Sequence, residues 1–451
     1  MEKLEQLISD ASSMIWGYPL IILLTGGGLF FAFYSRFLPF KYFGHAINIL
    51  RGKYDRPDDP GQINHFQALS SALAATIGMG NISGVALAIG INGGGPGAIF
   101  WMWISALVGI CIKFFTCTLA ILYRGKDSEG ELQGGPMYVI REGLGKKWMP
   151  LAIFFSIAGF FGATPVFQTN QMVAVLRDVI FEPLGFQESF GLNLSIGLAI
   201  ATLATIVIIG GIKRIGLVAS RLVPSMVILY MVSVGIILLL NFESILPSLS
   251  LIINDVFTAQ AALGGAVGAI VLEGTKRAAF SNEAGIGMAP MYHGAAKTNE
   301  PVREGLVAMM EPAIDTLVVC TLTGLCIIIT GVWTMEESNG IALTALAFGQ
   351  SLPGIGPYIL LLCVITFAIT TIFGMAYCGR KCLSFLIGAK RGKWFNYWYI
   401  GLIILGSVAS LDIVVNLVFV AYGLMAFPTM ISAILLAPKV MEEAKRYFSK
   451  V

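Results

Sequence analysis

The chain has 451 residues, of which 56% are hydrophobic and only 12% are charged; soluble proteins carry about 25% charged residues, so this composition excludes a soluble protein. The net charge of +3 is small and the sequence has no basic domain, so we expect no nucleic-acid partner. The apolar runs are long and continuous, which predicts helices of about 20 residues that cross a lipid bilayer rather than the strands of a β-barrel.

About eleven segments are apolar and long enough to span a membrane as helices. In chain order we expect these spans near 16–36, 64–90, 97–123, 150–176, 190–211, 216–241, 257–275, 304–332, 356–377, 394–412 and 414–437. With the amino terminus outside, every lysine and arginine except Lys3, Arg177 and Lys113 then falls on the cytoplasmic side. Because basic loops stay in the cytoplasm, this asymmetry predicts a multi-pass protein of the cell membrane with a cytoplasmic carboxyl terminus.

The second and seventh of these spans are interrupted by glycines. One interruption lies in Ala74–Gly84 (AATIGMGNISG) and the other in Ala262–Gly268 (ALGGAVG). Glycine disfavours helix, and an opened helix inside a bilayer leaves N–H and C=O groups that need partners. Interruptions at corresponding positions in two halves of a chain are the best sequence indication of a transporter's substrate site.

Without the first span, ten remain, and each interrupted span opens a group of five. Five helices separate the two interruptions, so the groups face opposite ways across the membrane, as in an inverted repeat. We therefore expect an all-α polytopic membrane protein with an N-terminal segment and accessory helix at 1–62, a first five-helix repeat at 63–241, and a second repeat with a cytoplasmic tail at 242–451. The segments 124–149 and 276–303 are expected as cytoplasmic loops; the second is interpreted as a connector, with a gate as the alternative.

The first interruption is suited to an anionic group, because open backbone N–H groups and helix N-termini bind anions. Thr76 adds a hydroxyl, Gly78 and Gly80 let a ligand approach the main chain beside Met79, and the amide of Asn81 can hold the break open. The alternative is that these glycines only allow close helix packing, which is common in membranes. The second interruption would complete the substrate site with Gly264, Gly265 and Ala266.

The ninth span supplies oxygen atoms that suit a sodium ion. The hydroxyls of Thr370 and Thr371 are adjacent, and the first break frees backbone carbonyls near Ala74 and Ile77. Threonine hydroxyls in helices often bond to the carbonyl one turn back instead, and this alternative stays open.

The fourth span carries Phe167 and Gln168 in a polar stretch, and polar groups at this depth are costly unless they have a function. Gln168 can bond to a substrate carboxylate or amine, with Phe167 as a hydrophobic lid; hydrogen bonding between helices is the alternative.

Ionisable groups inside spans are few. Glu311 and Asp315 lie four residues apart on one helix face, and we expect Lys113 to pair with one of them as a buried structural bridge, with a proton relay as the alternative.

Three segments resemble a known family: GGGPGAIFWMWISALVG at 93–109, the glycine-rich run at 76–84, and SNEAGIG at 281–287. They are similar to the alanine or glycine:cation symporter family, and the resemblance covers essentially the whole chain. It implies sodium-coupled uptake of small amino acids and the leucine-transporter fold of five plus five helices.

The resemblance also implies where the ligands bind. The substrate carboxylate would meet the backbone from Thr76 to Gly80, and one sodium would lie between the carbonyl and threonine oxygens described above. Ala262 aligns with the threonine that completes a second sodium site in some relatives, so we expect a single sodium. The expected preference for alanine and glycine comes from the resemblance.

Two rival functions remain at this point. A proton-coupled carrier of the same fold would titrate Glu311, Asp315 or Lys113, and a channel would need a continuous polar pore, whereas the polar residues here cluster at mid-depth. The sequence contains no nucleotide-binding loop and no catalytic constellation, so we expect neither enzyme activity nor a prosthetic cofactor. The expected partners are alanine or glycine, co-transported sodium, and the lipid bilayer.

Overall fold

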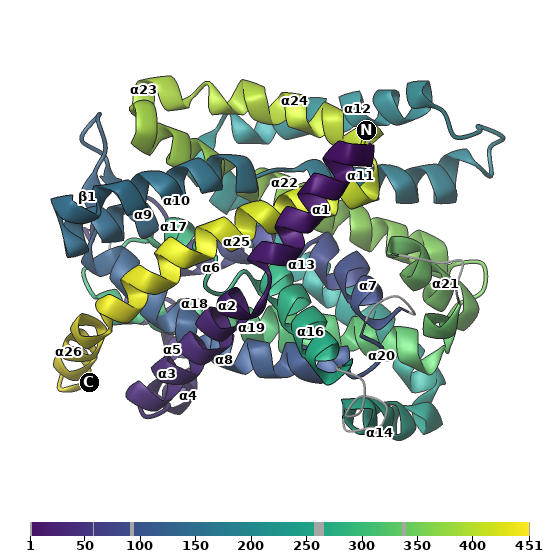
Figure 1. The fold of residues 1–451 in the computed structure, drawn as a ribbon, viewed down its shortest axis with the longest axis horizontal. Coiled ribbons are helices and arrows are strands. Elements are labelled where there is room, and N and C mark those ends of the chain that lie inside the picture. Colours follow the sequence, from purple (N-terminus) through teal and green to yellow (C-terminus); the bar gives the residue numbers. More distant parts are fainter. Residues whose placement is uncertain (1, 57, 91–93, 257–265, 336–339, 451) are drawn as a thin grey trace.

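The computed structural model describes residues 2–56, 58–90, 94–256, 266–335 and 340–450 (Figure 1). In this part of the chain nearly every element is a helix, and the only strands are the antiparallel pair β1 (Gly125–Lys126) and β2 (Leu132–Gln133). Seven of the described helices are long and apolar enough to cross a membrane, or up to nine if two bent helix pairs each count as one span. The all-α membrane architecture is therefore confirmed, whereas the total of eleven spans stays a prediction.

The long helices lie at the positions expected from the sequence. In chain order they are α8 (Ala98–Leu122), the run of α10 (Met149–Gly162), α11 (Val166–Leu176) and η5 (Arg177–Phe181), α12 (Phe190–Ile208), α13 (Gly211–Leu240), the run of α18 (Pro301–Ala308), α19 (Met310–Pro312), η7 (Ala313–Cys320) and α20 (Thr321–Ile329), α22 (Gly356–Ile387), and α25 (Leu411–Leu435). Two further helices at expected span positions are shorter: α16 (Ala266–Asn282) has 17 residues and α24 (Phe395–Val408) has 14.

Shorter elements connect and flank these helices. They are α4 (Leu38–Lys41), α5 (Phe43–Leu50), α9 (Pro136–Tyr138), η3 (Val139–Leu144), η4 (Lys146–Trp148), η6 (Phe242–Ser244), α14 (Ile245–Val256), α17 (Ala289–His293), η8 (Val332–Thr334), α21 (Ile341–Ser351), α23 (Ala389–Gly392) and α26 (Ala437–Phe448).

The first span is a bent helix pair that packs on the outside of the molecule. It consists of α1 (Glu2–Ile15), then α2 (Tyr18–Ile21), η1 (Ile22–Gly26) and α3 (Gly27–Tyr34), with a bend of 41°. At the bend the indole N–H of Trp16 donates to the carbonyl of Phe419 at 2.7 Å, which fixes α1 along α25 (Figure 1). The accessory role expected for this span stays a prediction.

The second span is broken where the glycines predicted it. Helix α6 (His65–Thr76) ends, and η2 (Gly80–Gly84) followed by α7 (Val85–Ile89) continues at an angle of 53°. Helix α6 begins with a capping box, in which Asn64 accepts from the backbone N–H of Gln67 and Gln67 accepts from that of Asn64. The capping box stabilises the start of α6, and the glycines destabilise the helix after its end. Together they confine the break to three residues.

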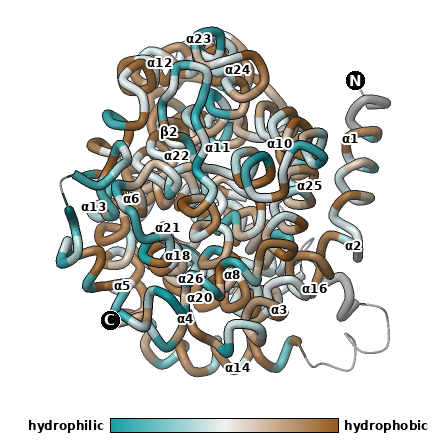
Figure 2. Tube along the Cα trace, turned by 90° about the vertical axis from the view of Figure 1, so that its left-hand side faces the viewer, coloured by the Kyte–Doolittle hydropathy of each residue, from teal (hydrophilic) through white to brown (hydrophobic). Residues whose placement is uncertain are grey.

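The burial of the helices indicates which of them surround the site. Most of α8 and α22 is buried, whereas α12 and α13 expose large apolar side chains such as Leu203 (54% exposed) and Leu239 (73%). The helices α3 and α14 are likewise hydrophobic along the outside of the molecule (Figure 2). Extensive exposed apolar surface is typical of a membrane interaction, so α8, α22 and the broken α6–α7 form the protected centre.

The structure describes an interruption after the seventh span at a position that the sequence did not predict. The expected interruption at Ala262–Gly268 lies mostly outside the described residues, including Gly264 and Gly265, and from Ala266 onward the chain is helical. The interruption that the structure describes is residues 283–288, where α16 ends and three residues, Glu283, Gly285 and Gly287, have positive φ. These residues were expected in a cytoplasmic connector, but they are buried in the fold.

One local and one long-range hydrogen bond hold the chain where α16 ends. The Asn282 side chain accepts from the N–H of Ala284 at 2.9 Å, and the Thr429 hydroxyl donates to the carbonyl of Ile286 at 3.1 Å. At the other end of this stretch, Lys276 and Arg277 pack against the ring of Phe419 inside the fold, at 4.2 and 5.3 Å from its centroid. The basic pair therefore does not mark the start of a surface loop.

Candidate substrate and sodium site

The first break leaves two backbone N–H groups that side chains occupy. The N–H of Gly78 donates to Oδ1 of Asn81 at 2.9 Å, and the N–H of Met79 donates to Oε1 of Gln168 at 2.9 Å. All four residues are buried. A neutral amide oxygen from a neighbouring helix thus occupies a position in which an anionic oxygen would bind more strongly.

The carbonyl side of the same break faces α22. The hydroxyl of Thr371 lies 3.4 Å from the carbonyl oxygen of Ile77 and also donates to Phe367 one turn back at 2.9 Å. A Cβ on Gly78 would come within 2.4 Å of that hydroxyl oxygen, so α22 approaches the break this closely only because residue 78 is glycine. The structure therefore brings Ile77, Gly78, Gln168 and Thr371 together.

The hydroxyl of Thr370, unlike that of Thr371, makes no hydrogen bond to the first break among the described residues. Its hydroxyl donates to carbonyls of its own helix, those of Thr366 at 2.9 Å and Phe367 at 3.0 Å, and lies 3.4 Å from the sulfur of Met226. This is the alternative that the sequence left open for threonines in helices. A role for Thr370 as a cation ligand would require its hydroxyl to leave these carbonyls.

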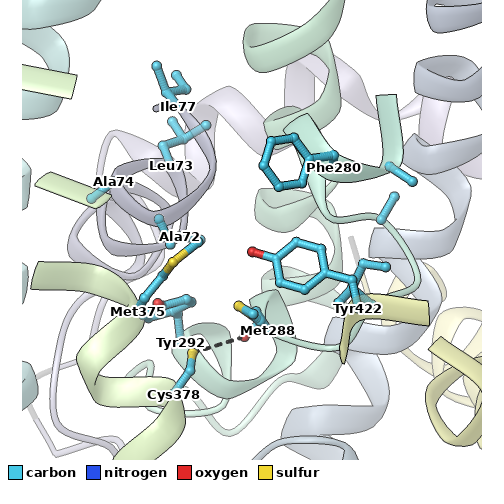
Figure 3. Close-up of a cluster of buried hydrophobic side chains, with 14 of the residues drawn as sticks. Ala72, Leu73, Ala74, Ile77, Phe280, Met288, Tyr292, Met375, Cys378 and Tyr422 are labelled. Carbon is cyan, nitrogen blue, oxygen red and sulfur yellow. Dashed lines mark hydrogen bonds between the residues drawn. The ribbon is translucent and has the colours of Figure 1, made fainter. Parts of the chain in front are cut away.

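Aromatic rings cover the far side of the break. Phe167 and Phe280 meet edge to face with centroids 5.2 Å apart, and Phe280 lies 5.9 Å from Tyr422. A Cβ on Gly80 would lie 3.4 Å from both the Phe280 ring and the backbone of Ser281. Figure 3 shows Phe280 and Tyr422 on one side and, on the other, Leu73 of α6 and Ile77 of the first break.

A buried carboxylate links the two broken spans. Asp315 accepts from the side-chain amide of Asn81 at 2.7 Å, from the hydroxyl of Ser281 at 2.8 Å and from Thr316 at 2.8 Å. Among the described residues, no basic nitrogen lies within the 4.0 Å of an ion pair. The residue that caps Gly78 is thus held by the end of α16 through Asp315.

The second break contributes an acidic group that the sequence did not single out. The carboxylate of Glu283 is buried, its Oε1 accepts from the hydroxyl of Tyr422 at 2.7 Å, and its Oε2 has no hydrogen-bond partner among the described residues. Three polar residues followed by two glycines, in Ser281–Gly287, were the signal that could have located this break.

A cavity of about 360 Å³ lies further along α22 and is lined by the loop at 127–133, the start of α13 and the last turns of α22. Its lining includes Ala376 and Tyr377, less than two turns along α22 from Thr371. The Lys381 ammonium at its wall donates to the carbonyls of Gly134 and Met291 at 3.0 Å each. On the predicted topology this cavity lies on the cytoplasmic side.

The family comparison identifies what kind of protein carries this site. The model described as the sodium:alanine symporter family matches residues 1–451. The chain belongs to the sodium:alanine symporter family. The resemblance found in the sequence is thereby confirmed, and the protein is a cation-coupled amino-acid transporter rather than an enzyme.

Two relatives in this family match nearly the whole chain. The sodium/alanine symporter AgcS of Methanococcus maripaludis is 37% identical over 447 residues, which cover 98% of this chain and 96% of AgcS. The probable sodium/glutamine symporter GlnT of Bacillus subtilis is 34% identical over 447 residues, which cover 98% of this chain and 91% of GlnT.

The solved structure of MhsT in complex with L-phenylalanine matches the fold. The TM-score is 0.62 at 15% sequence identity, over 86% of this chain and 93% of MhsT. This likeness confirms the leucine-transporter fold class for this member of the sodium:alanine symporter family. The inverted repeat and the boundaries at 62 and 241 stay predictions.

Proposed function

We propose that this symporter imports alanine or glycine together with sodium by alternating access. It would lie in the cell membrane with its amino terminus outside and its carboxyl terminus in the cytoplasm. One observation carries the proposal: at the first break the N–H of Met79 is held by Gln168, while the neighbouring carbonyl of Ile77 lies beside the hydroxyl of Thr371. Donors for an anion and acceptors for a cation thus alternate along one opened stretch of backbone.

The substrate carboxylate would displace Gln168 from Met79. A carboxylate forms charge-assisted hydrogen bonds that are about twice as strong as those of a neutral amide oxygen, and the start of η2–α7 favours negative charge. Gln168 would then be free to turn its amide toward the ligand. The remaining proposed contacts are those expected from the sequence: Thr76, Gly78, Gly80, Phe167, Gly264, Gly265 and Ala266.

Sodium would bind the carbonyl side of the same break. The proposed ligands are the carbonyls of Ala74 and Ile77 and the hydroxyls of Thr370 and Thr371. The 3.4 Å separation of the Ile77 carbonyl and the Thr371 hydroxyl allows both oxygens to touch one ion. An ion there would also balance freed carbonyl groups that would otherwise be costly in a membrane.

Space at the break supports a small substrate. Phe280 and Ser281 already lie at contact distance from a Cβ on Gly80, and Phe167 closes on Phe280. The printed name of AgcS specifies alanine and that of GlnT specifies glutamine. We place this chain with the alanine carrier because the aromatic pair leaves little volume above the glycines.

One sodium provides enough energy for useful uptake. A charge that crosses about 100 mV contributes roughly 2.3 kcal/mol, and a tenfold sodium gradient adds about 1.4 kcal/mol. The sum of about 3.7 kcal/mol supports roughly 500-fold accumulation of a neutral zwitterion.

Uptake by purified protein in liposomes tests the proposal. At equal pH on both sides, an inward sodium gradient should drive accumulation of labelled alanine, unlabelled glycine should compete, and glutamine should compete poorly. Potassium in place of sodium is the control. Accumulation without sodium under an inward proton gradient would support the proton-coupled rival, and uptake that does not saturate would support a channel.

A further inference from the structure

A row of acidic and basic side chains crosses the interior, away from the proposed ligand site. His293 contacts Glu304 through Nδ1 and Glu311 through Nε2, both at 2.5 Å, and Lys113 lies 2.6 Å from the other oxygen of Glu311. His65 contacts the second oxygen of Glu304 through Nδ1. We call these five residues, His65, Glu304, His293, Glu311 and Lys113, the acid–base chain; all five are buried.

The acid–base chain goes beyond the expected bridge. The pairing of Lys113 with Glu311 confirms the sequence-based prediction, but the bridge continues through two histidines that the sequence did not connect with it. One end reaches solvent, because Asp55 lies 3.9 Å from Nε2 of His65 and its side chain is 43% exposed. A gap of this size can be closed by a water or by a small side-chain movement.

The contacts of His293 need one proton more than a neutral histidine and two carboxylates supply. Each nitrogen–oxygen contact of His293 at 2.5 Å requires one hydrogen between the two atoms. A neutral imidazole carries only one N–H, so both contacts need either an imidazolium or a protonated carboxyl group. With the proton present, Lys113 and His293 balance Glu304 and Glu311; without it, a buried negative charge is left uncompensated, which is costly.

Other charged and titratable groups surround the acid–base chain from the neighbouring elements. Arg303 lies near His65, and Arg124 near Glu304. At the inner end, the carboxyl groups of Glu283 and Asp315 and the thiol of Cys117 lie near Lys113. Two arginines thus lie toward the solvent end and two carboxylic acids toward the inner end. This arrangement favours a proton on the inner residues of the acid–base chain over one on His65.

The helices that carry the acid–base chain are those next to the two breaks. His65 opens α6, which leads into the first break, and His293 ends α17, which follows the second break. Glu304 lies on α18, Glu311 on α19 and Lys113 on α8. A movement of α6 or α17 against α8 therefore changes the contacts that hold the extra proton.

We propose that the acid–base chain is a proton-binding site whose proton is exchanged with solvent through His65 and Asp55 as the transporter changes conformation. Inward transfer breaks the Nδ1–H bond of protonated His65 and forms an O–H bond on Glu304. The carboxyl group then rotates and gives that proton to Nδ1 of neutral His293, which keeps the hydrogen on Nε2 toward Glu311 and so becomes an imidazolium. No electrons are transferred, and the proton returns to solvent by the reverse of these steps.

This proposal rests on the proposed function for the conformational change, and it is tested by counting protons. Purified protein in dilute buffer with a pH-indicator dye is mixed with sodium and alanine at several values between about pH 5 and 8, where histidine titrates. We expect proton release or uptake by the natural protein that varies with pH. No proton exchange anywhere in this range, with sodium-dependent alanine binding intact in a thermal-shift assay, would overturn the proposal.

Two variants locate the protons. His293→Gln keeps one donor and one acceptor but cannot hold the extra proton, and we expect the proton signal and the pH dependence of uptake to disappear while alanine still binds. His65→Gln, at the solvent end, should slow the exchange and provides a second reading if His293→Gln does not fold. Proton exchange that is unchanged in either folded variant would contradict the assignment.

The third histidine of the chain is the matched control. His45 on α5 bonds to the hydroxyl of Tyr447 at 2.7 Å and is outside the acid–base chain. Burial, followed by Arg303 and Lys53, lowers its pKa. His45→Gln should leave the proton count unchanged. If sodium-dependent binding is itself absent in the natural protein, the proposed function fails, whereas a missing proton signal alone removes only this inference.

Discussion

The side-chain oxygen of Gln168 accepts the backbone N–H of Met79 at 2.9 Å, across the break between α6 and η2. This bond satisfies a backbone group that would cost several kcal/mol if left unpaired in a membrane. It also means that a ligand carboxylate at Met79 has to replace a protein group rather than fill an empty position.

Gln168→Glu should act as a tethered competitor of the substrate. The new carboxylate has nearly the same shape as the amide but forms a stronger bond to Met79. We expect the affinity for alanine to fall by about tenfold or more, equivalent to at least about 1.4 kcal/mol, and the loss to grow as pH rises, because only the ionised form competes. Equilibrium binding of labelled alanine measures this change.

The matched control for that change is Gln171→Glu, on the same helix. Gln171 accepts from the Ser83 hydroxyl at 2.7 Å rather than from the opened backbone. We expect it to lower stability without the pH-dependent loss of alanine binding. Equal losses in both variants would show that Gln168 does not occupy the carboxylate position.

Thr371→Ala should weaken sodium binding specifically. The change removes one oxygen ligand from a cation, and an interaction of this kind is typically worth about 1.5–3 kcal/mol, or roughly 10- to 150-fold in affinity. The measurement is the sodium concentration at half-maximal alanine binding. Thr366→Ala is the control, since that hydroxyl bonds only to carbonyls of its own helix among the described residues. An unchanged sodium requirement in a folded Thr371→Ala protein argues against this ion site.

Gly78→Ala should abolish transport. The added methyl group would lie 2.4 Å from the Thr371 hydroxyl and 3.1 Å from Gln168, so α22 or α11 has to move away from the break. Gly235→Ala on α13 is the matched control, because nothing lies within 4 Å of its Cβ position. It should keep full activity and gain about 0.5–1 kcal/mol of helix stability. Uptake assays and thermal unfolding of both variants separate a lost site from a misfolded protein.

Lys113→Met should destabilise the protein, because it leaves Glu311 with a buried charge that His293 alone must balance. Breaking a buried ion pair in this way costs about 3–5 kcal/mol, seen as a lower unfolding temperature in detergent. The double variant Lys113→Met with Glu311→Leu should recover part of the loss. Lys439→Met, in an exposed pair with Glu442, should change nothing measurable. Equal stability of Lys113→Met and the natural protein would contradict a structural role for the bridge.

The sequence located the first break because its cause is local. Gly78 and Gly80 weaken the helix themselves, and Asn81 caps the opened N–H from three residues away. The long helices were also predictable, since α8 and α12 are continuous apolar runs. The pairing of Lys113 followed from the scarcity of charges at that depth.

The second break was missed because only part of its cause is local. Its stabilising groups, Tyr422 and Thr429, come from α25, more than a hundred residues further along the chain. The glycines at Gly264 and Gly265 gave a stronger local signal than Gly285 and Gly287. The histidines of the acid–base chain were missed for the same reason, because His65 and His293 meet only through Glu304 in the folded molecule.

The central claim is that sodium and substrate bind adjacent peptide groups of the same opened stretch, Ile77–Met79. Calorimetric titration of the purified protein tests this claim most directly, with sodium titrated in the presence and absence of alanine and alanine in the presence and absence of sodium. Binding to a shared break requires that each ligand strengthens the other by the same factor. Dissociation constants for sodium and alanine that do not depend on one another would contradict the claim.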